Sequence, residues 1–297
     1  MKLKFLKNNS PLGVAFDLFN VLFLATYSLL AILPFFYVIA GSFATTYEFR
    51  TRPFFIVPQT FTAASYIYIL KSARLLQSIY ISVIRTVLGT LTNMFFTVTM
   101  AYPLARKSLK GRSLILNLVV FTMFFSGGMI PTFLVVRSVG LLDKIGALIL
   151  PGAISAWNLI VIKNFFQELP PGLEEAARMD GCNDMRTLWH IVLPLSMPVV
   201  ATFSLFYAVG HWNAFFDALI YMQSMSKWPL QLILRQMITV AQGALGDAAM
   251  IDASYGTLPE DGVKMAVIVV STVPILMIYP LLQKHFTKGV LVGAIKG

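Results

Sequence analysis

The sequence of 297 residues has little charge and almost no cysteine. Charged residues make up 12% of the chain, about half of the roughly 25% that is usual in soluble domains. Apolar residues make up 57%, and the mean hydropathy is +0.76. A single cysteine, Cys182, excludes an intrachain disulfide and a cysteine-based metal cluster. His190, His211 and His285 form no H-x-x-x-H pattern, so we expect no metal site.

Several catalytic and nucleotide-binding motifs are also missing. The sequence has no G-x-x-x-x-G-K-[ST] pattern, so it cannot by itself hold ATP in a P-loop. It has neither H-E-x-x-H nor G-x-S-x-G, so we expect no catalytic residue, no cofactor in this chain and no enzyme activity. The net charge of +10 comes without a basic stripe interleaved with aromatics, so no nucleic-acid partner is expected.

Long uncharged segments dominate the sequence instead. A membrane-spanning helix needs about 20 apolar residues, and backbone groups in lipid must be satisfied within the segment. We therefore expect an all-α polytopic membrane protein with six transmembrane helices, forming one transmembrane domain over residues 1–297. The expected spans are roughly 14–41, 80–105, 113–136, 145–166, 194–221 and 264–284, with a loop at 167–193. The first span has no charge from Leu18 to Tyr47, so we expect it to be retained rather than cleaved as a signal peptide.

The distribution of lysine and arginine predicts the orientation. Thirteen basic residues lie on one side of the predicted membrane and nine on the other, and the bias is clearest in the short loops. The thirteen are Lys2, Lys4, Lys7, Arg106, Lys107, Lys110, Arg112, Lys163, Arg178, Arg186, Lys284, Lys288 and Lys296. The positive-inside rule then places both termini and the 167–193 loop in the cytoplasm. Arg85 lies inside the second span, where we expect its long side chain to reach the outer interface.

The 167–193 loop carries signals for two short helices. Leu173 to Met179 contains good helix formers, with acidic residues in its first turn. Gly181 interrupts this helix and permits a turn with positive φ. Asn183 can cap a second helix from Asp184 to Ile191. Pro194 falls where the fifth span begins, a position that tolerates proline.

The spacing E-A-A, three residues, Gly, nine residues and I-x-L-P, which starts at Glu175 and ends at Pro194, resembles the cytoplasmic loop of ABC importer permeases. Within these, the chain resembles the carbohydrate-uptake (maltose-type) family, and most closely its polysaccharide and lipo-oligosaccharide permease branch. The stretch 125–132 (FSGGMIPT), Trp212-Asn213 and the tail 286–297 support this resemblance, which runs from about residue 15 to the end. Cys182 and Trp189 replace the usual alanine and phenylalanine and keep apolar contacts.

The resemblance implies a permease subunit of a binding-protein-dependent ABC importer in the bacterial cytoplasmic membrane. It would pass an oligosaccharide or polysaccharide by alternating access, with ATP and Mg bound to partner subunits. The implied partners are a second homologous permease subunit in a heterodimer, a cytoplasmic ABC ATPase dimer, an extracytoplasmic solute-binding protein and the carbohydrate substrate. The residues expected to dock the ATPase are Glu174, Glu175, Ala176, Ala177, Asp180 and Gly181.

Other interpretations of the same residues remain open. The chain could serve as an ABC permease for a non-sugar solute or as a stand-alone secondary transporter. In a stand-alone secondary transporter the loop would have no ATPase to dock. The loop itself could also be only a solvated amphipathic linker. The two long outer loops, 42–75 and 222–262, could be plain connections or contact a substrate-delivery protein.

Polar groups inside the spans are candidates for the substrate pathway, because such groups are costly in a bundle and usually functional. The candidates are Ser126, Gly127, Trp157, Asn158, Trp212, Asn213 and Asp217. Asn213 and Asp217 are four residues apart, so we expect them on one helical face. Tryptophan is also common at membrane interfaces and asparagine often pairs helices. The glycines after Ser126 could allow close helix packing or form an unwound turn that lines a cavity.

Overall fold

The computed structural model describes residues 11–241 and 261–294, and every regular element within them is a helix. These residues belong to two compact units. In the described chain, the first unit comprises residues 11–71 and 261–270, and the second comprises 72–241 and 271–294. Residues 242–260 of the predicted outer loop 222–262 lie outside the described residues.

The described part of the first unit contains one long helix, two short ones and the first turns of another long helix. Its helices are α1 (Pro11–Ser42), α2 (Thr46–Thr51), α3 (Ala64–Lys71) and the beginning of α14 (Asp261–Ala294). A small apolar cluster of Ala40, Ala44 and Phe55 joins the end of α1 to the loop after α2. The predicted span 14–41 is thus a single helix of nearly the expected length.

A buried carboxylate organises the segment that follows α1. Glu48 is 3% exposed. Its Oε1 accepts hydrogen bonds from Arg52 Nη1 at 2.7 Å and from the backbone N–H of Gln59 at 2.8 Å. Because one carboxylate holds both α2 and the turn after it, the described part of the predicted outer loop 42–75 is locally ordered.

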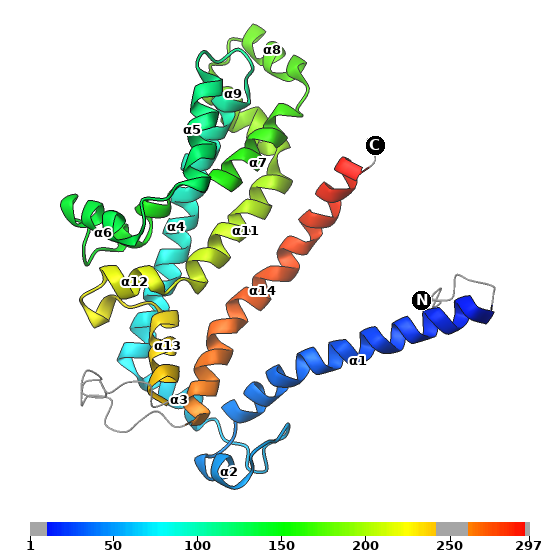
Figure 1. Cartoon of the computed structure of the whole chain (residues 1–297), viewed down its shortest axis with the longest axis vertical. Coiled ribbons are helices and arrows are strands. Elements are labelled where there is room, and N and C mark those ends of the chain that lie inside the picture. The colour runs from blue at the N-terminus through cyan, green and yellow to red at the C-terminus, as the bar shows by residue number, and fades with distance from the viewer. Residues whose placement is uncertain (1–10, 242–260, 295–297) are drawn as a thin grey trace. The chain divides into compact units, whose positions relative to one another are not determined.

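The second unit contains the remaining helices. They are α4 (Ala73–Ala105), α5 (Arg112–Phe124), α6 (Met129–Ser138), η1 (Ile145–Leu148), η2 (Leu150–Gly152), α7 (Ala156–Gln167), α8 (Pro171–Met179), α9 (Asp184–Thr187), the π-helix η3 (Leu188–Val192), α10 (Leu193–Leu195), α11 (Met197–Asn213), α12 (Phe216–Tyr221), η4 (Met225–Lys227), α13 (Leu230–Ala241) and most of α14. The core of this unit is the packing of α4 along α7 and α11, which run side by side (Figure 1).

Hydrogen bonds between polar side chains hold these helices in register. The hydroxyls of Thr97 in α4 and Tyr207 in α11 lie 2.8 Å apart, and the Tyr207 hydroxyl also accepts from the N–H of Ser155 at 3.2 Å. Ser155 is the N-cap of α7, so one tyrosine connects three elements. Trp212 Nε1 donates to the carbonyl of Ser271 in α14 at 2.7 Å.

Three helices, α1, α4 and α14, are long and apolar enough to cross a membrane alone, and three bent pairs raise the total to as many as six among the described residues. The helix α4 begins at Ala73 rather than near residue 80, because the Ser72 side chain caps it by accepting from the N–H of Leu75.

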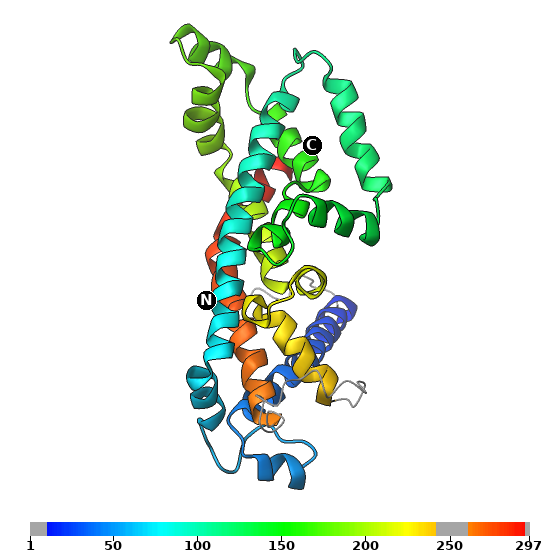
Figure 2. The ribbon, with the colours of Figure 1, turned by 90° about the vertical axis from the view of Figure 1, so that its left-hand side faces the viewer.

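The predictions of single spans at 113–136, 145–166 and 194–221 are wrong in one respect, because each of these regions contains a bend or a break. The pair α5 and α6 bends by 117° (Figure 2), η1–η2 and α7 by 54°, and the segment leading into α11 by 88°. Residues 125–128 separate α5 from α6, and Gly128 has φ +82°. These residues form an unwound turn, and Gly127 lines a pocket, in line with one of the two interpretations of the glycines.

Candidate functional site

The 167–193 loop folds as the sequence predicts, as helix, turn and helix. The helix α8 ends at Met179 with Asp180 as its C-cap, and Gly181 follows with φ +77°. The N–H of Cys182 donates to the carbonyl of Ala177 at 2.9 Å, and the N–H of Gly181 donates to that of Arg178 at 3.0 Å. This pair of bonds is a Schellman motif, which closes a helix through a glycine in the left-handed conformation. The predicted positive φ at Gly181 is confirmed.

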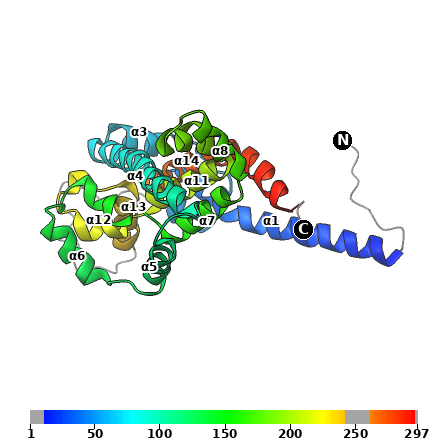
Figure 3. The same cartoon turned by 90° about the horizontal axis from the view of Figure 1, so that it is seen from above.

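The second short helix also begins where predicted. The Asn183 side chain accepts from the N–H of Arg186 at 2.8 Å, which confirms Asn183 as the N-cap. The helix α9 continues as the π-helix η3 and then as α10, so the turns run on without interruption to Ser196. There the chain bends by 88° into α11. In Figures 1 and 3, α8 lies at the end of the α4, α7 and α11 bundle.

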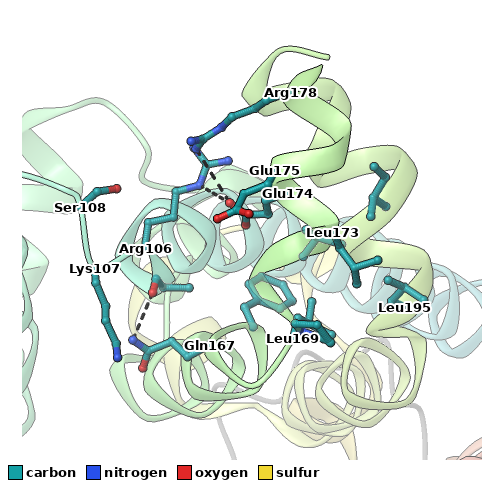
Figure 4. A pocket seen from close by; sticks show the side chains of 15 residues that line it. Arg106, Lys107, Ser108, Gln167, Leu169, Leu173, Glu174, Glu175, Arg178 and Leu195 are labelled. Atoms are coloured by element: carbon teal, nitrogen blue, oxygen red, sulfur yellow. Dashed lines mark hydrogen bonds and ion pairs between the residues drawn. The ribbon is translucent and has the colours of Figure 1, made fainter. Parts of the chain in front are cut away.

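Arg106, the first residue after α4, connects the two short helices. Its Nε lies 3.0 Å from Glu174 Oε2 in α8 (Figure 4). Its Nη1 lies 2.6 Å from Asp184 Oδ1 in α9. The guanidinium lies 4.4 Å from the ring centre of Tyr102 and also donates to its hydroxyl. Burial works against the charge, but the hydrogen bond to Asp184 and the nearby Glu174 raise the pKa of Arg106, so it is a permanent cation.

Sequence reasoning counted Arg106 only toward membrane orientation and missed these contacts. Its position directly after an apolar span was a topological signal, and nothing local pointed to acidic partners so far along the chain. Arg178 also approaches Glu174, at 4.0 Å.

The residues expected to dock an ATPase differ in exposure. Glu175, Ala176, Asp180 and Gly181 are exposed, whereas Glu174 is partly buried against Arg106. Ala177 is 2% exposed, so its small side chain faces the protein. Two apolar side chains that sequence reasoning did not select are open to solvent, Met179 at 88% and Met185 at 57% exposure.

A pocket of about 510 Å³ lies beneath α8 (Figure 4). Its walls come from the loop after α4, the end of α7, α8 itself and the η3–α10 segment. Apolar side chains such as Phe166, Leu169 and Leu173 line part of it, and the charged groups of Arg106, Glu174, Glu175 and Arg178 line the rest. This pocket, which has charged side chains along one wall, therefore lies between α8 and the ends of α4 and α7.

The candidate pathway residues fall into three groups. Ser126 and Gly127 lie in the turn between α5 and α6, and Gly127 lines a pocket of about 420 Å³. Trp157 is 63% exposed and Asn158 is 9% exposed, both in the first turn of α7. None of the hydrogen bonds described here joins these groups to Asn213, so their shared role stays a prediction.

The third group surrounds the break between α11 and α12. Trp212 is 7% exposed and packs toward α14, while its neighbour Asn213 is exposed. The prediction that Asn213 and Asp217 share one helical face is wrong, because α11 ends at Asn213 and α12 begins at Phe216. Both residues still flank the same break.

The Arg85 side chain is buried inside the protein, so the prediction that it extends outward to an interface is wrong. The residue is 2% exposed, its Nη1 donates to the carbonyl of Ala214 at 2.9 Å, and it forms an ion pair with Asp217. A buried arginine is stable in a bundle when an acidic partner and a backbone acceptor satisfy it. Sequence reasoning missed the partner because Asp217 is 132 positions further along the chain, although Ser82, Gly89 and Asn93 recur on the same buried face of α4 as Arg85.

An all-helical membrane chain with an exposed, capped helix–turn–helix between two spans has the features of a translocation subunit. Residues 75–292 match the family described as binding-protein-dependent transport system inner membrane component, and the chain belongs to this family of ABC importer permeases. Its members are translocation subunits rather than enzymes, with the ATPase on a separate subunit. The predictions of a polytopic membrane permease and of an ABC importer family are confirmed.

Individual relatives cover nearly the whole chain. It is 55% identical over 290 residues to Protein LplC of Bacillus subtilis (strain 168), with 98% of each chain covered. It is 51% identical over 282 residues to the polygalacturonan/rhamnogalacturonan transport system permease protein YtcP of the same organism, covering 95% of this chain and 98% of that one.

Solved structures also resemble the chain. A chain of a bacterial ABC transporter involved in the import of the acidic polysaccharide alginate matches with a TM-score of 0.85 and 31% identity, covering 94% of this chain and 99% of that chain. A chain of the alginate transporter in complex with an alginate pentasaccharide-bound periplasmic protein matches with a TM-score of 0.59 at 15% identity, which supports the fold alone.

Proposed function

We propose that residues 1–297 act as one transmembrane domain that passes an oligosaccharide derived from an acidic polysaccharide. The observation that carries the transport role is the exposed helix–turn–helix at 171–192, closed by the Schellman motif at Gly181. The substrate class is supported by the relatives, because YtcP is named for polygalacturonan and the matching structure imports alginate.

The proposed partners follow from the family. A second permease subunit completes a heterodimer, an ATPase dimer binds ATP and Mg, and a solute-binding protein delivers the sugar on the outer side. Both termini and the 167–193 loop lie in the cytoplasm, as the distribution of basic residues supports. The exposed residues Glu175, Ala176 and Asp180, together with Gly181, contact a groove of the ATPase. Met179, at 88% exposure, adds an apolar contact to this surface.

The docking role is tested by replacing Glu175 with lysine in the assembled complex. A reversed charge on an exposed helical position leaves the fold intact, because surface changes of this kind alter stability by only about 0.5 kcal/mol. We expect the Glu175→Lys variant to retain less ATPase on affinity purification, while Lys107→Ala, on a different loop, retains as much as the unaltered chain. A Gly181→Ala variant is tested in the same way. If both variants retained as much ATPase as the unaltered chain, the docking role would be contradicted.

The substrate class is tested in proteoliposomes that contain the complex, ATP and the solute-binding protein. We expect labelled trigalacturonate to accumulate inside only when ATP is present, and excess neutral maltotriose not to compete. Uptake of a non-sugar solute in its place would favour an ABC permease of different specificity. Uptake without any ATPase would favour a stand-alone secondary transporter.

A further inference from the structure

Arg106 differs from the other basic residues of its loop. Lys107 and Lys110 are exposed, as expected for charges that only set membrane orientation. The Arg106 side chain is 14% exposed and is buried between structural elements. Membrane topology explains why a cation lies here but not why this one is held inside.

The contacts of Arg106 reach three elements at once. One edge of the guanidinium binds Glu174 in α8, another binds Asp184 in α9, and its face lies over the ring of Tyr102 in α4. A planar guanidinium can make all three contacts, whereas a lysine ammonium is a single point charge that cannot bind both carboxylates and stack on the ring.

Two kinds of contact fix α8 to the rest of the unit: the packing of the buried Ala177 side chain, and the ion pair between Glu174 and Arg106. The hollow of about 510 Å³ separates α8 from the ends of α4 and α7. Among the described helices, none packs along α8 as closely as α7 and α11 pack along α4. The position of α8 relative to α4 therefore depends on the polar wall of the pocket, where Arg106 and Glu174 meet (Figure 4).

We propose that Arg106 is a positioning residue that joins both short helices of the 167–193 loop to α4, so that a displacement of the loop moves α4 and the helices packed on it. The inference rests on the proposed docking function and assigns Glu174 and Asp184 a role inside the chain. Both carboxylates act through Arg106, while Glu175, on the exposed side of α8, remains available to the ATPase.

The test uses the full complex in nanodiscs, with Arg106→Ala and Arg106→Lys variants and Lys107→Ala as the matched control. Lys107 is the exposed neighbour with the same charge. One measurement is the amount of ATPase retained, and the other is the increase in ATP hydrolysis on adding the solute-binding protein. We expect retention to change little, whereas the increase falls about 10-fold to 100-fold in Arg106→Ala, the range of a typical coupling between sites. Arg106→Lys gives an intermediate loss, and Lys107→Ala gives none.

A double-mutant cycle separates this role from general destabilisation. If Glu174 and Asp184 act through Arg106, adding Arg106→Ala to the pair Glu174→Gln and Asp184→Asn causes no further loss. Fully additive losses would overturn the inference, as would an unchanged increase in hydrolysis in Arg106→Ala. If Arg106→Ala does not assemble, the cycle is completed with Arg106→Lys.

The outcomes also separate this inference from the proposed function. An unaltered chain that retains no ATPase would overturn the proposed function and the role of Arg106 with it. The role of Arg106 alone would be overturned if the solute-binding protein increased ATP hydrolysis equally in the unaltered complex and in the Arg106→Ala complex.

Discussion

Arg85 in α4 and Asp217 in α12 form an ion pair across the break at the end of α11. The arginine side chain is 2% exposed and the aspartate side chain is 29% exposed. A second bond from Arg85 to the carbonyl of Ala214 occupies a backbone acceptor that the ending helix leaves free. The pair therefore fixes the geometry of the break beside Asn213, the exposed pathway candidate.

Removing one member of this pair should destabilise the protein more than removing both. The Arg85→Met variant leaves the Asp217 carboxylate without its partner, at a cost of about 3 kcal/mol, whereas apolar replacement of a whole buried pair is often close to neutral. We expect the thermal unfolding midpoint in detergent to fall clearly in Arg85→Met and to recover in the double variant with Asp217→Leu. A double variant no more stable than Arg85→Met would argue against the pair.

The contact between α4 and α11 should be sensitive at Gly89. A Cβ built on Gly89 lies 2.4 Å from Nε2 of His211. His211 Nε2 also lies 3.3 Å from Oδ1 of Asn93, so the ring cannot move aside without losing this contact. We expect Gly89→Ala to lower stability by about 1–3 kcal/mol, as overpacking does.

Gly210 provides the matched control for this substitution. It lies in α11, and no atom lies within 4 Å of its added Cβ. Alanine there should be neutral or slightly stabilising, since glycine costs a helix interior about 0.5–1 kcal/mol relative to alanine. Adding His211→Ala to Gly89→Ala should restore part of the lost unfolding midpoint, and a failure to do so would mean that the clash is not the cause.

Substitutions at Gly181 should follow backbone preference rather than side-chain size. No atom lies within 4 Å of an added Cβ, so the cost comes from the φ of +77°. An ordinary L-residue pays about 1–2 kcal/mol in this conformation, and asparagine pays less. We expect ATPase retention to fall in the order Gly181, Gly181→Asn, Gly181→Ala. A Cβ added at Gly172 also meets open space, so Gly172→Ala should retain as much ATPase as the unaltered chain. Equal retention in the unaltered chain and all three variants would refute the role of the turn.

Acid should weaken the connection between residues 141–144 and 221–227. Asp143 accepts from Lys227 Nζ at 2.6 Å, from the Ser224 hydroxyl at 2.6 Å and from two backbone N–H groups. The hydrogen bond from Lys227, followed by those from Ser224, lowers the pKa of Asp143 well below its usual range.

A carboxyl whose pKa is lower in the folded state stabilises the protein above its unfolded pKa of about 3.9, and this contribution is lost as the pH falls through the folded value. We expect the unfolding midpoint of Asp143→Asn at pH 7 to be lower than that of the unaltered protein. The difference between the two midpoints should become smaller as the pH approaches 3. A constant difference between pH 7 and pH 3 would contradict this assignment.

The parts of the site that could be predicted are those set by local chemistry. The turn at Gly181 and the cap at Asn183 depend on residues within a few positions, so the sequence was sufficient. The existence of six apolar segments was likewise a matter of composition. The bends were harder, because hydropathy measures how apolar a segment is and not its direction, so α5 and α6 were predicted as a single span.

The parts that could not be predicted depend on contacts between distant residues. Arg106 and Glu174 are separated by 68 positions, and Arg85 and Asp217 by 132. The small and polar residues Ser82, Gly89 and Asn93 recur on the face of α4 that holds Arg85, and this face is buried. The burial of Arg85 was missed because this pattern was not used. The contact of Glu174 with Arg106 was missed because the sequence around Glu174 suggests an exposed acid.

Cys182 gives the 167–193 loop a practical advantage. It is the one cysteine in the sequence, and it lies directly after Gly181, half-buried, with its N–H bonded to Ala177. A thiol-reactive fluorophore or spin label would therefore attach at a single position without any engineering of the chain. Its spectrum would register the movement of this turn while the transporter cycles.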